Sequence, residues 1–515
     1  MEPDRIAGPS NRSIFFSLAA GDARLRLPGG LARFGYRLET GQADKRPAVY
    51  LDTSGGVLYR TGRRLCWVPD PGVWQWLEEG VVRSEEYAGR AGAPAAWPGW
   101  PGGTPDLAGL TWRELLTVED ATRTFRATTP GGGALFLVHH RHWFSPPGET
   151  RRKEGPAWLE IWSAQAGGRE TGVCAALLRD LFGLTAGIMD PLKDGLKVLD
   201  LPKPGDLPAG LAAPGGGGSI PELGCLVLAR QCFRIEGNAV GAFLDLDPEF
   251  GHDVRVATRR ARFALRLCGD CFSPDWSVPL RQELRWLAGL CGTVRDLDVV
   301  LETVRKQAEA GEIDGRIPPE TARRFAAWRA EAVRVLRTGL QSDRYRDLVA
   351  SLRLPREAAA DGDSGNGPPW VGDTASKYLR AAFQKVCRWR SRPEPELTPA
   401  RLHRLRIDFK RLRYTGEFFR ETFPECLDEL IVATIRYQDC LGRHQDARVA
   451  MDLLNTMAER LWKEGAGGPE ASLWLGECRQ MFRYRARAER GQFIELWSEF
   501  DAFRERFLAV VKELQ

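Results

Sequence analysis

The chain has 515 residues, more than a single hydrophobic core normally supports, so two or three domains are expected. Its hydrophobic share of 43% and charged share of 27% are those of an ordinary globular protein. The formal net charge of +5 is small for this length, so the overall charge does not by itself indicate an anionic partner.

The sequence carries no sign of export. No N-terminal stretch combines a basic start, an apolar run and a cleavage site, and no run of about 18 uncharged apolar residues occurs. We therefore expect a cytoplasmic protein without a membrane-spanning helix. Eleven cysteines without a framework indicate reduced thiols. Cys268 and Cys271 form a Cys-x-x-Cys pair, but no second pair of ligands lies nearby, so packed thiols are favoured over a metal.

The first part of the chain, residues 1–200, predicts a β domain. It is rich in Gly, Pro and Trp, and short apolar runs at 64–68 and 134–139 are separated by clusters of turn residues. One segment, 173–184, has a convincing helical pattern.

Two motifs in this part carry a family resemblance. Tyr50-Leu-Asp-Thr53 is followed by Leu58-Tyr-Arg-Thr-Gly-Arg-Arg64, and together they resemble the CYTH family, also called triphosphate tunnel metalloenzymes. The resemblance implies an eight-stranded antiparallel tunnel that hydrolyses or forms triphosphates with Mg²⁺ or Mn²⁺.

The metal-binding part of that pattern is missing. The family opens on a strand with Glu-x-Glu-x-Lys, whereas residues 11–18 contain no carboxylate, and the stretch 157–162 offers only Glu160. A hard divalent cation needs one or two carboxylates in a fixed shell. We therefore predict a degenerate tunnel-like domain with no catalytic residue, no bound metal and no cofactor.

A histidine cluster, His139-His140-x-His142, raises the alternative of zinc. Neighbouring strand residues point to opposite faces, so only His140 and His142 could share a ligand shell. No Cys, Asp or Glu stands close to them in the sequence to complete the shell. A basic or aromatic tunnel lining is the favoured interpretation.

Two Gly-rich segments mark the boundaries between the remaining parts of the chain. Residues 201–221 form a flexible linker with four consecutive glycines, and a second polar, Gly-rich break covers 359–369. The domain at 222–515 is predicted to be all-α, with halves at about 222–352 and 373–515. Runs of helix length include 279–290, 320–340, 427–441 and 491–514.

The first half contains a helical stretch at 252–266 whose polar face is cationic. Residues spaced by three and four fall on one helix face. This face carries His252, Arg255, Arg259, Arg262 and Arg266, with Arg260 beside it. Like charges one turn apart destabilise a helix by about 0.2–0.5 kcal/mol per pair, a cost that an anion would remove.

The second half repeats this stretch at 403–414, at an offset of 151 residues (403 − 252). The equivalent residues are His403, Arg406, Lys410, Arg411 and Arg413. Glu417 stands at the place of Arg266. A single Arg-rich helix is more often a solvated basic face. A basic face that only contacts water does not need its cations at fixed positions, however. The repeat of a histidine and four cations at equivalent positions therefore favours a ligand shared by the two helices.

The pattern His-x-x-Arg-x-x-x-Arg-Arg-x-Arg carries a second resemblance. It is followed by Leu-Cys-Gly-Thr-Val-Arg-Asp-Leu-Asp at 290–298, which Leu-Gly-Arg-His-Gln-Asp at 441–446 echoes. Together these motifs resemble the CHAD domain, the conserved-histidine α-helical domain, and CYTH domains often precede CHAD on one chain. The resemblance implies a duplicated helical module that binds inorganic polyphosphate, and it adds Arg295 and His444 to the candidate binding residues.

The sequence thus predicts an α+β multidomain protein with an antiparallel β tunnel or barrel-like domain and two pseudo-symmetric helical bundles. The favoured function is binding of inorganic polyphosphate in a basic channel, in the cytoplasm and at polyphosphate granules, with polyphosphate-metabolising enzymes as further candidate partners. The alternative is a metal-dependent triphosphatase or polyphosphatase in the N-terminal tunnel. Nucleic acid is disfavoured, because aromatic residues that stack bases do not interleave with the cations. A helical scaffold for partner proteins is the remaining interpretation.

Overall fold

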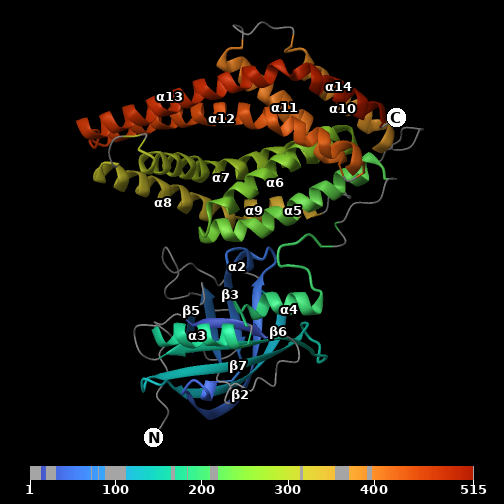
Figure 1. Cartoon of the computed structure of the whole chain (residues 1–515). Helices are drawn as coiled ribbons and strands as arrows, with labels where there is room; N and C mark the ends of the chain where they lie inside the picture. The colour runs from blue at the N-terminus through green and yellow to red at the C-terminus, as the bar shows by residue number, and fades with distance from the viewer. Residues whose placement is uncertain are drawn as a thin grey trace. The chain divides into compact units, whose positions relative to one another are not determined.

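The computed structural model describes residues 13–18, 31–70, 72–78, 81–86, 112–163, 169–182, 184–208, 211, 218–311, 313, 317–353, 371–390, 397–420 and 422–513. Contacts divide the chain into two compact units, Met1–Asp206 and Leu207–Gln515. Figure 1 shows that the first unit is built on a sheet and the second on helices.

The first unit contains an antiparallel sheet, as the sequence predicts. Its strands are β1 (Ile14–Leu18), β2 (Arg37–Thr53), β3 (Arg63–Val68), β4 (Val73–Glu78), β5 (Val81–Glu86), β6 (Trp112–Thr128), β7 (Ala134–Ser145), β8 (Lys153–Ser163) and β9 (Thr185–Gly187). They pair in the order β5-β4-β3-β2-β6-β7-β8-β1-β9. Within the described residues, β5 and β9 are the two ends of this order.

Helices pack against both faces of the sheet, because apolar side chains alternate along the strands. On one face, α3 (Arg169–Phe182) buries Cys174 and Leu178 in a core with Leu135, Leu137, Leu159 and Ile161. On the other face, α4 (Pro191–Leu199) buries Leu192 and Leu196 in a core with Tyr50, Cys66, Leu116 and Phe144. The predicted helix at 173–184 corresponds to α3, whereas sequence patterns missed α4.

Asp52, in the motif at 50–53 that resembles the CYTH family, stabilises the turn between β2 and the next helix. Asp52 is buried and accepts hydrogen bonds from the backbone N–H groups of Thr53 at 2.7 Å, Leu58 at 3.0 Å and Tyr59 at 2.7 Å. These bonds fix the start of the short helix α2 (Val57–Arg60). Burial raises the pKa of Asp52 to about 6 despite these bonds. Part of the motif therefore builds the fold.

The regular elements of the second unit are all helices among its described residues, which fits the predicted all-α domain. The first half contains α5 (Ile220–Leu244), α6 (Pro248–Leu267), α7 (Pro274–Glu309), α8 (Pro319–Gln341) and α9 (Asp343–Arg353). The second half contains α10 (Val371–Cys387), α11 (Pro399–Phe419), α12 (Pro424–Lys463), α13 (Pro469–Ser498) and α14 (Phe500–Glu513). None of the described helices combines the length and apolarity that a membrane crossing needs.

Several helices begin with a side-chain cap and a proline, the combination that favours helix starts. Ser219 and Glu222 form a capping box at α5, and Thr398 caps α11. One predicted helix start, at a proline, differs from the structure. The predicted helix at 279–290 begins earlier, at Pro274, because Pro279 is accommodated inside the 36-residue helix α7.

A network of ion pairs joins three helices of the first half. Arg329 of α8 donates to both carboxylate oxygens of Asp245 at 2.7 and 2.8 Å and to Asp298 of α7 at 2.6 Å. Asp245 ends α5 in the left-handed backbone conformation. Asp298 lies in the motif at 290–298, so this motif residue orients α7 against its neighbours.

Candidate functional site

Helix α6 separates its apolar and cationic residues onto different faces. Val254, Ala257, Ala261 and Ala264 are buried, whereas the candidate residues are partly exposed. The candidate residues on this helix are His252, Arg255, Arg259, Arg260, Arg262 and Arg266. The predicted helix and its polar face are therefore present in the structure.

Helix α11 repeats the arrangement. Leu402, Leu405, Phe409 and Leu412 are buried, and the equivalent polar residues are His403, Arg406, Lys410, Arg411 and Arg413. His403 is exposed, and its Nδ1 lies 2.9 Å from Oε1 of Gln445 on α12.

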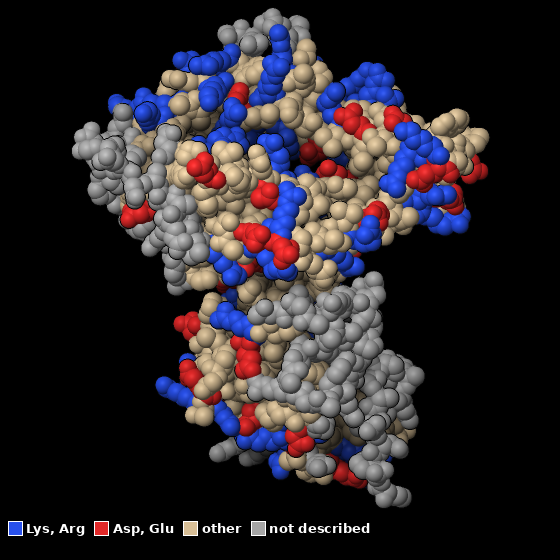
Figure 2. Space-filling model, turned by 180° about the vertical axis from the view of Figure 1, so that it is seen from behind, with Lys and Arg blue, Asp and Glu red and all other residues tan. Residues whose placement is uncertain are grey.

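The polar faces of α6 and α11 contact one another. The rings of Phe263 and Tyr414 are 5.5 Å apart, and the guanidinium of Arg259 lies 5.5 Å from the centre of the Tyr414 ring. Nη2 of Arg260 lies 3.0 Å from Oε2 of Glu417. Lys and Arg side chains gather on the face of the helical unit seen in Figure 2, some of them in a hollow. The fold thus brings together two segments that are 151 residues apart in the sequence (403 − 252).

Two ion pairs repeat between the halves. Arg255 lies 3.2 Å from Asp296 of α7, and its equivalent Arg406 lies 3.7 Å from Asp446 of α12. The motifs at 290–298 and 441–446 therefore supply one carboxylate each to the equivalent arginine.

Other candidate cations also have acidic partners. Nη2 of Arg295 lies 2.9 Å from Glu249, Nη1 of Arg411 lies 3.4 Å from Asp408, and Nε of Arg413 donates to Glu417 at 2.6 Å. These charges are already partly neutralised within the protein.

Four of the candidate cations form no ion pair within the part of the chain that the structure describes. These unpaired cations are Arg259, Arg262, Arg266 and Lys410. Loss of water contact, followed by the nearby charges of Arg285, Arg266 and Arg259, lowers the pKa of Arg262. Desolvation and the charges of Arg411, Arg281 and Arg285 lower the pKa of Arg266 in the same way. Cations from α6, α7 and α11 therefore repel one another.

Lys410 shows the strongest effect. Its pKa is lowered to about 7, first by desolvation and then by the charges of Arg406 and Arg259, against the opposing effect of Asp446. Arginines from both halves thus act on a single lysine. A bound anion would reverse this effect by stabilising the ammonium form.

Several buried donors at this contact have no hydrogen-bond partner among the described residues. They are Nε of Arg259, Nε of Arg260, Nε of Arg406 and the hydroxyl of Tyr414. An unsatisfied buried donor costs about 1–3 kcal/mol, so these groups favour a ligand that supplies acceptor oxygens.

A pocket of about 440 Å³ adjoins the contact between α6 and α11. Arg260, Phe263, Arg413 and Tyr414 line it, together with residues of α5 and α12 such as Val227 and Ile431. The pocket is therefore lined by both basic and apolar side chains.

The structure adds two residues to the candidate site and separates one from it. Arg285 of α7 acts on both Arg262 and Arg266, and Arg281 of α7 acts on Arg266. The spacing of Arg281 and Arg285 by one helical turn is the sequence signal that could have found them. His444 is only 4% exposed. Desolvation and the nearby Arg448 and Arg490 lower its pKa, and no cation of α6 or α11 is among the charges acting on it.

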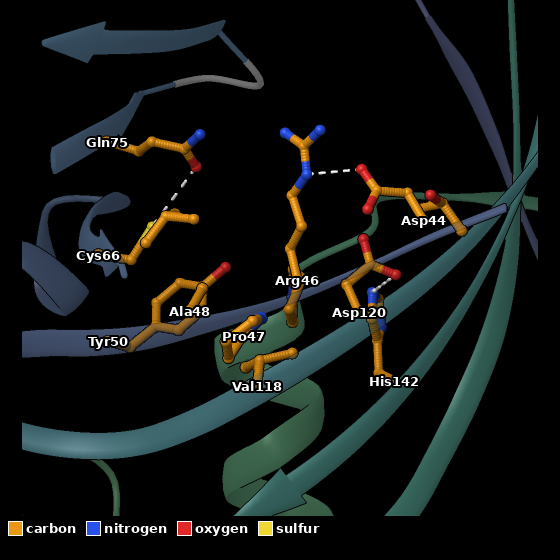
Figure 3. Close-up of a pocket in the computed structure, with 13 residues that line it drawn as sticks. Asp44, Arg46, Pro47, Ala48, Tyr50, Cys66, Gln75, Val118, Asp120 and His142 are labelled. Carbon is orange, nitrogen blue, oxygen red and sulfur yellow. Dashed lines mark hydrogen bonds and ion pairs between the residues drawn. The ribbon is translucent and has the colours of Figure 1, made fainter. Parts of the chain in front are cut away.

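The first unit holds a separate polar cluster beside a pocket of about 390 Å³ (Figure 3). Asp120 of β6 lies 2.9 Å from Nδ1 of His140 and 3.4 Å from Nε2 of His142, both on β7. The sequence places no carboxylate close to these histidines, but the fold brings Asp120 beside them. Asp120 is about twenty residues away along the chain, but the antiparallel register places it directly opposite His142.

The fold and the facing basic helices define a class: an internally duplicated helical module with a cationic contact between its halves. Residues 227–455 match the model of the CHAD domain family. The chain therefore contains a CHAD domain, preceded by an antiparallel β domain that is consistent with the tunnel-like resemblance.

Three known proteins illustrate the similarity. Uncharacterized protein MT2285 of Mycobacterium tuberculosis is 26% identical over 211 residues, 39% of this chain and 39% of its own length. The chain thus matches well under half of this curated relative. The CHAD domain from the plant Ricinus communis is 23% identical with a TM-score of 0.41, and the match covers 59% of this chain and 96% of that one. HpAC1 from Hippeastrum, described as having a dominant triphosphatase activity, is 13% identical with a TM-score of 0.22, covering 38% of this chain and 99% of that one.

Proposed function

We propose that this protein binds inorganic polyphosphate between α6 and α11. The observation that carries the proposal is the packing of two cationic helix faces against one another, with four candidate cations that form no ion pair among the described residues. Like charges in contact are destabilising unless a counter-charge joins them. The CHAD domain match supports an anionic ligand of the polyphosphate class.

The chemistry of the ligand fits these groups. Polyphosphate presents about one negative charge on each phosphate, so one chain meets several cations at once through charge-assisted hydrogen bonds. Guanidinium forks match phosphate oxygens in geometry. The unsatisfied Nε atoms of Arg259 and Arg406 and the Tyr414 hydroxyl provide further donors on both helices. We propose that the same affinity associates the protein with polyphosphate granules.

The test is a titration of the full chain with long-chain polyphosphate, tripolyphosphate and duplex DNA, each with and without Mg²⁺, while released phosphate is assayed. We expect polyphosphate to bind more tightly than DNA, with an affinity that falls linearly in log units with the logarithm of salt concentration. Equal binding of DNA would favour a general polyanion surface. Metal-dependent phosphate release would favour the alternative, a triphosphatase or polyphosphatase in the first unit.

The pKa of Lys410 predicts a pH dependence of binding. In the free protein this lysine loses its proton above about pH 7, whereas the bound polyanion favours the protonated form. Binding therefore takes up a proton above pH 7, and the affinity should fall by up to about tenfold per pH unit between pH 7 and pH 9.

The matched control for this prediction is Lys410→Arg, which keeps the charge at all these pH values. Fluorescence anisotropy with labelled polyphosphate across the pH range measures both proteins. A wild-type affinity that stays constant from pH 7 to pH 9, or a variant that keeps the full pH dependence, would contradict the role of Lys410.

A further inference from the structure

The strongest unassigned feature lies in the first unit, where Asp120, His140 and His142 point to the same face of the sheet. In the register of β6 and β7, Asp120 is opposite His142 and Thr122 is opposite His140. Residues two apart on a strand share a face. One potential ligand atom from each of Asp120, His140 and His142 lies within 4.8 Å of the others.

The bonding of His142 points to a missing ligand. Its side chain is only 1% exposed, and neither ring nitrogen has a hydrogen-bond partner among the described residues. Oδ1 of Asp120, 3.4 Å from Nε2 of His142, is likewise buried without a hydrogen bond. Buried polar atoms are normally satisfied, so this pair of groups needs an explanation.

A purely structural network explains only half of the cluster. Nδ1 of His140 lies 2.9 Å from Asp120, and its Nε2 lies 3.3 Å from Glu160, whose carboxylate accepts a hydrogen bond from Ser13 at 2.7 Å. These contacts satisfy His140. They leave both ring nitrogens of His142 without a hydrogen-bond partner among the described residues, although His142 lies on the same face of the sheet.

We propose that Asp120, His140 and His142 bind a divalent transition-metal ion of the zinc class. The ligand atoms are a carboxylate oxygen of Asp120, Nδ1 of His140 and Nε2 of His142. Two imidazoles and a carboxylate suit zinc and its neighbours, whereas Mg²⁺ and Ca²⁺ favour shells made of oxygen. The ion supplies the partner that the buried nitrogen of His142 lacks.

The geometry requires little movement. Zinc ligands lie at about 2.0–2.2 Å from the ion, so ligand atoms in one shell are about 3–4 Å apart. The cluster is already close to that size. Glu160 would accept from Nε2 of His140 and hold the ring in the tautomer that presents Nδ1 to the ion, as second-shell carboxylates do.

The site also has an open side. His142 and Asp120 line the pocket of about 390 Å³, together with Asp44, Arg46 and Thr122. Arg46 extends into the region above Asp120 in Figure 3 and is paired there with Asp44 at 2.6 Å. Three protein ligands leave at least one coordination position, which faces this pocket and is available to water or an anion.

This site differs from the one that the tunnel-like resemblance implies. That resemblance predicts glutamates on the first strand, where this chain has Ser13, Phe15 and Ser17. The proposed ion instead sits on the neighbouring strands β6 and β7 and uses nitrogen ligands. The proposal does not depend on polyphosphate binding by the helical unit.

The experiment uses the full chain, stripped of metal with a chelator and then dialysed. Isothermal titration with Zn²⁺ should show one tight site per chain, and Co²⁺ should give visible absorption bands without the intense near-ultraviolet band of a thiolate ligand. Zn²⁺ should also raise the melting temperature, because binding to the folded state alone is stabilising.

Asp120→Asn and His142→Gln should each weaken Zn²⁺ binding at least about a hundredfold, since each removes a ligand from the shell. The matched control is His139→Gln, because His139 is adjacent in sequence but points to the opposite face of β7. Circular dichroism checks that each variant is folded, and Asp120→Asn keeps the shape of the side chain. The absence of a tight site in the parent, or equal binding in Asp120→Asn and the parent, would overturn the proposal. Equal loss in His139→Gln would do so as well.

Discussion

Replacing Arg259, Arg262 and Lys410 together with alanine is expected to lower the affinity for long-chain polyphosphate by about a thousandfold or more. None of the three forms an ion pair within the described part of the chain, so each is available to the ligand. A charge-assisted hydrogen bond is worth about 1.5–3 kcal/mol, and about 1.4 kcal/mol corresponds to a tenfold change in affinity. The salt dependence should become shallower, because fewer counterions are displaced.

The control is a protein with the same change of charge at cations that are already paired. Arg305, Arg334 and Arg346 are exposed and bridge to acidic residues on their own helices. Alanine at these three positions should change polyphosphate affinity only slightly. Binding by the Arg259, Arg262 and Lys410 variant that remains as tight as in the parent at physiological salt would show that the facing helices are not the site.

The ion pairs also predict which single substitutions should weaken polyphosphate binding more. By the duplication, Arg259 and Arg262 are equivalent to Lys410 and Arg413. Arg413 donates to Glu417 at 2.6 Å, however, so Arg413→Ala should weaken binding less than Arg262→Ala. Both variants should remain folded, because alanine favours helix and relieves like-charge repulsion.

The second large effect is expected at Arg329, and it concerns stability. Arg329→Met leaves the carboxylates of Asp245 and Asp298 without their shared partner, and the side chain of Asp298 is only 10% exposed. Removing one member of a buried ion pair typically costs about 3–5 kcal/mol in the free energy of unfolding. Urea unfolding monitored by circular dichroism measures the change.

Two comparisons make this prediction specific. Arg334→Met lies on the same helix, where Arg334 pairs with Glu331 on the surface, and should change stability by less than about 0.5 kcal/mol. Adding Asp298→Asn to Arg329→Met should restore part of the loss, because it removes a buried charge. A loss below about 1 kcal/mol in Arg329→Met would show that the network contributes little.

The helical part of the fold was predictable because its signals are local or repeated. The apolar positions Leu402, Leu405, Phe409 and Leu412 follow the helical period, and all four are buried. The repeat of a histidine and four cations at a constant offset indicated two equivalent halves before any contact was known. Proline and capping residues then marked several helix starts.

The metal-capable cluster could not be predicted from sequence because it depends on strand register. His140 and His142 were visible as a pair on one face, but Asp120 joins them only through the antiparallel alignment of β6 and β7. The burial of His444 was not predictable from sequence for a different reason. A motif repeat shows which residues are equivalent along the chain, whereas the orientation of α12 decides that this side chain faces the core.

The duplicated halves have one more consequence for the ligand that we propose. Polyphosphate has no direction, since its two ends are alike and every unit is the same. Two equivalent walls can therefore accept such a chain in either orientation, and a shift by one phosphate restores the same set of contacts. The number of equivalent placements grows with the length of the chain. Longer polymers should consequently occupy the site at lower molar concentration, even though the number of contacts at any moment stays constant.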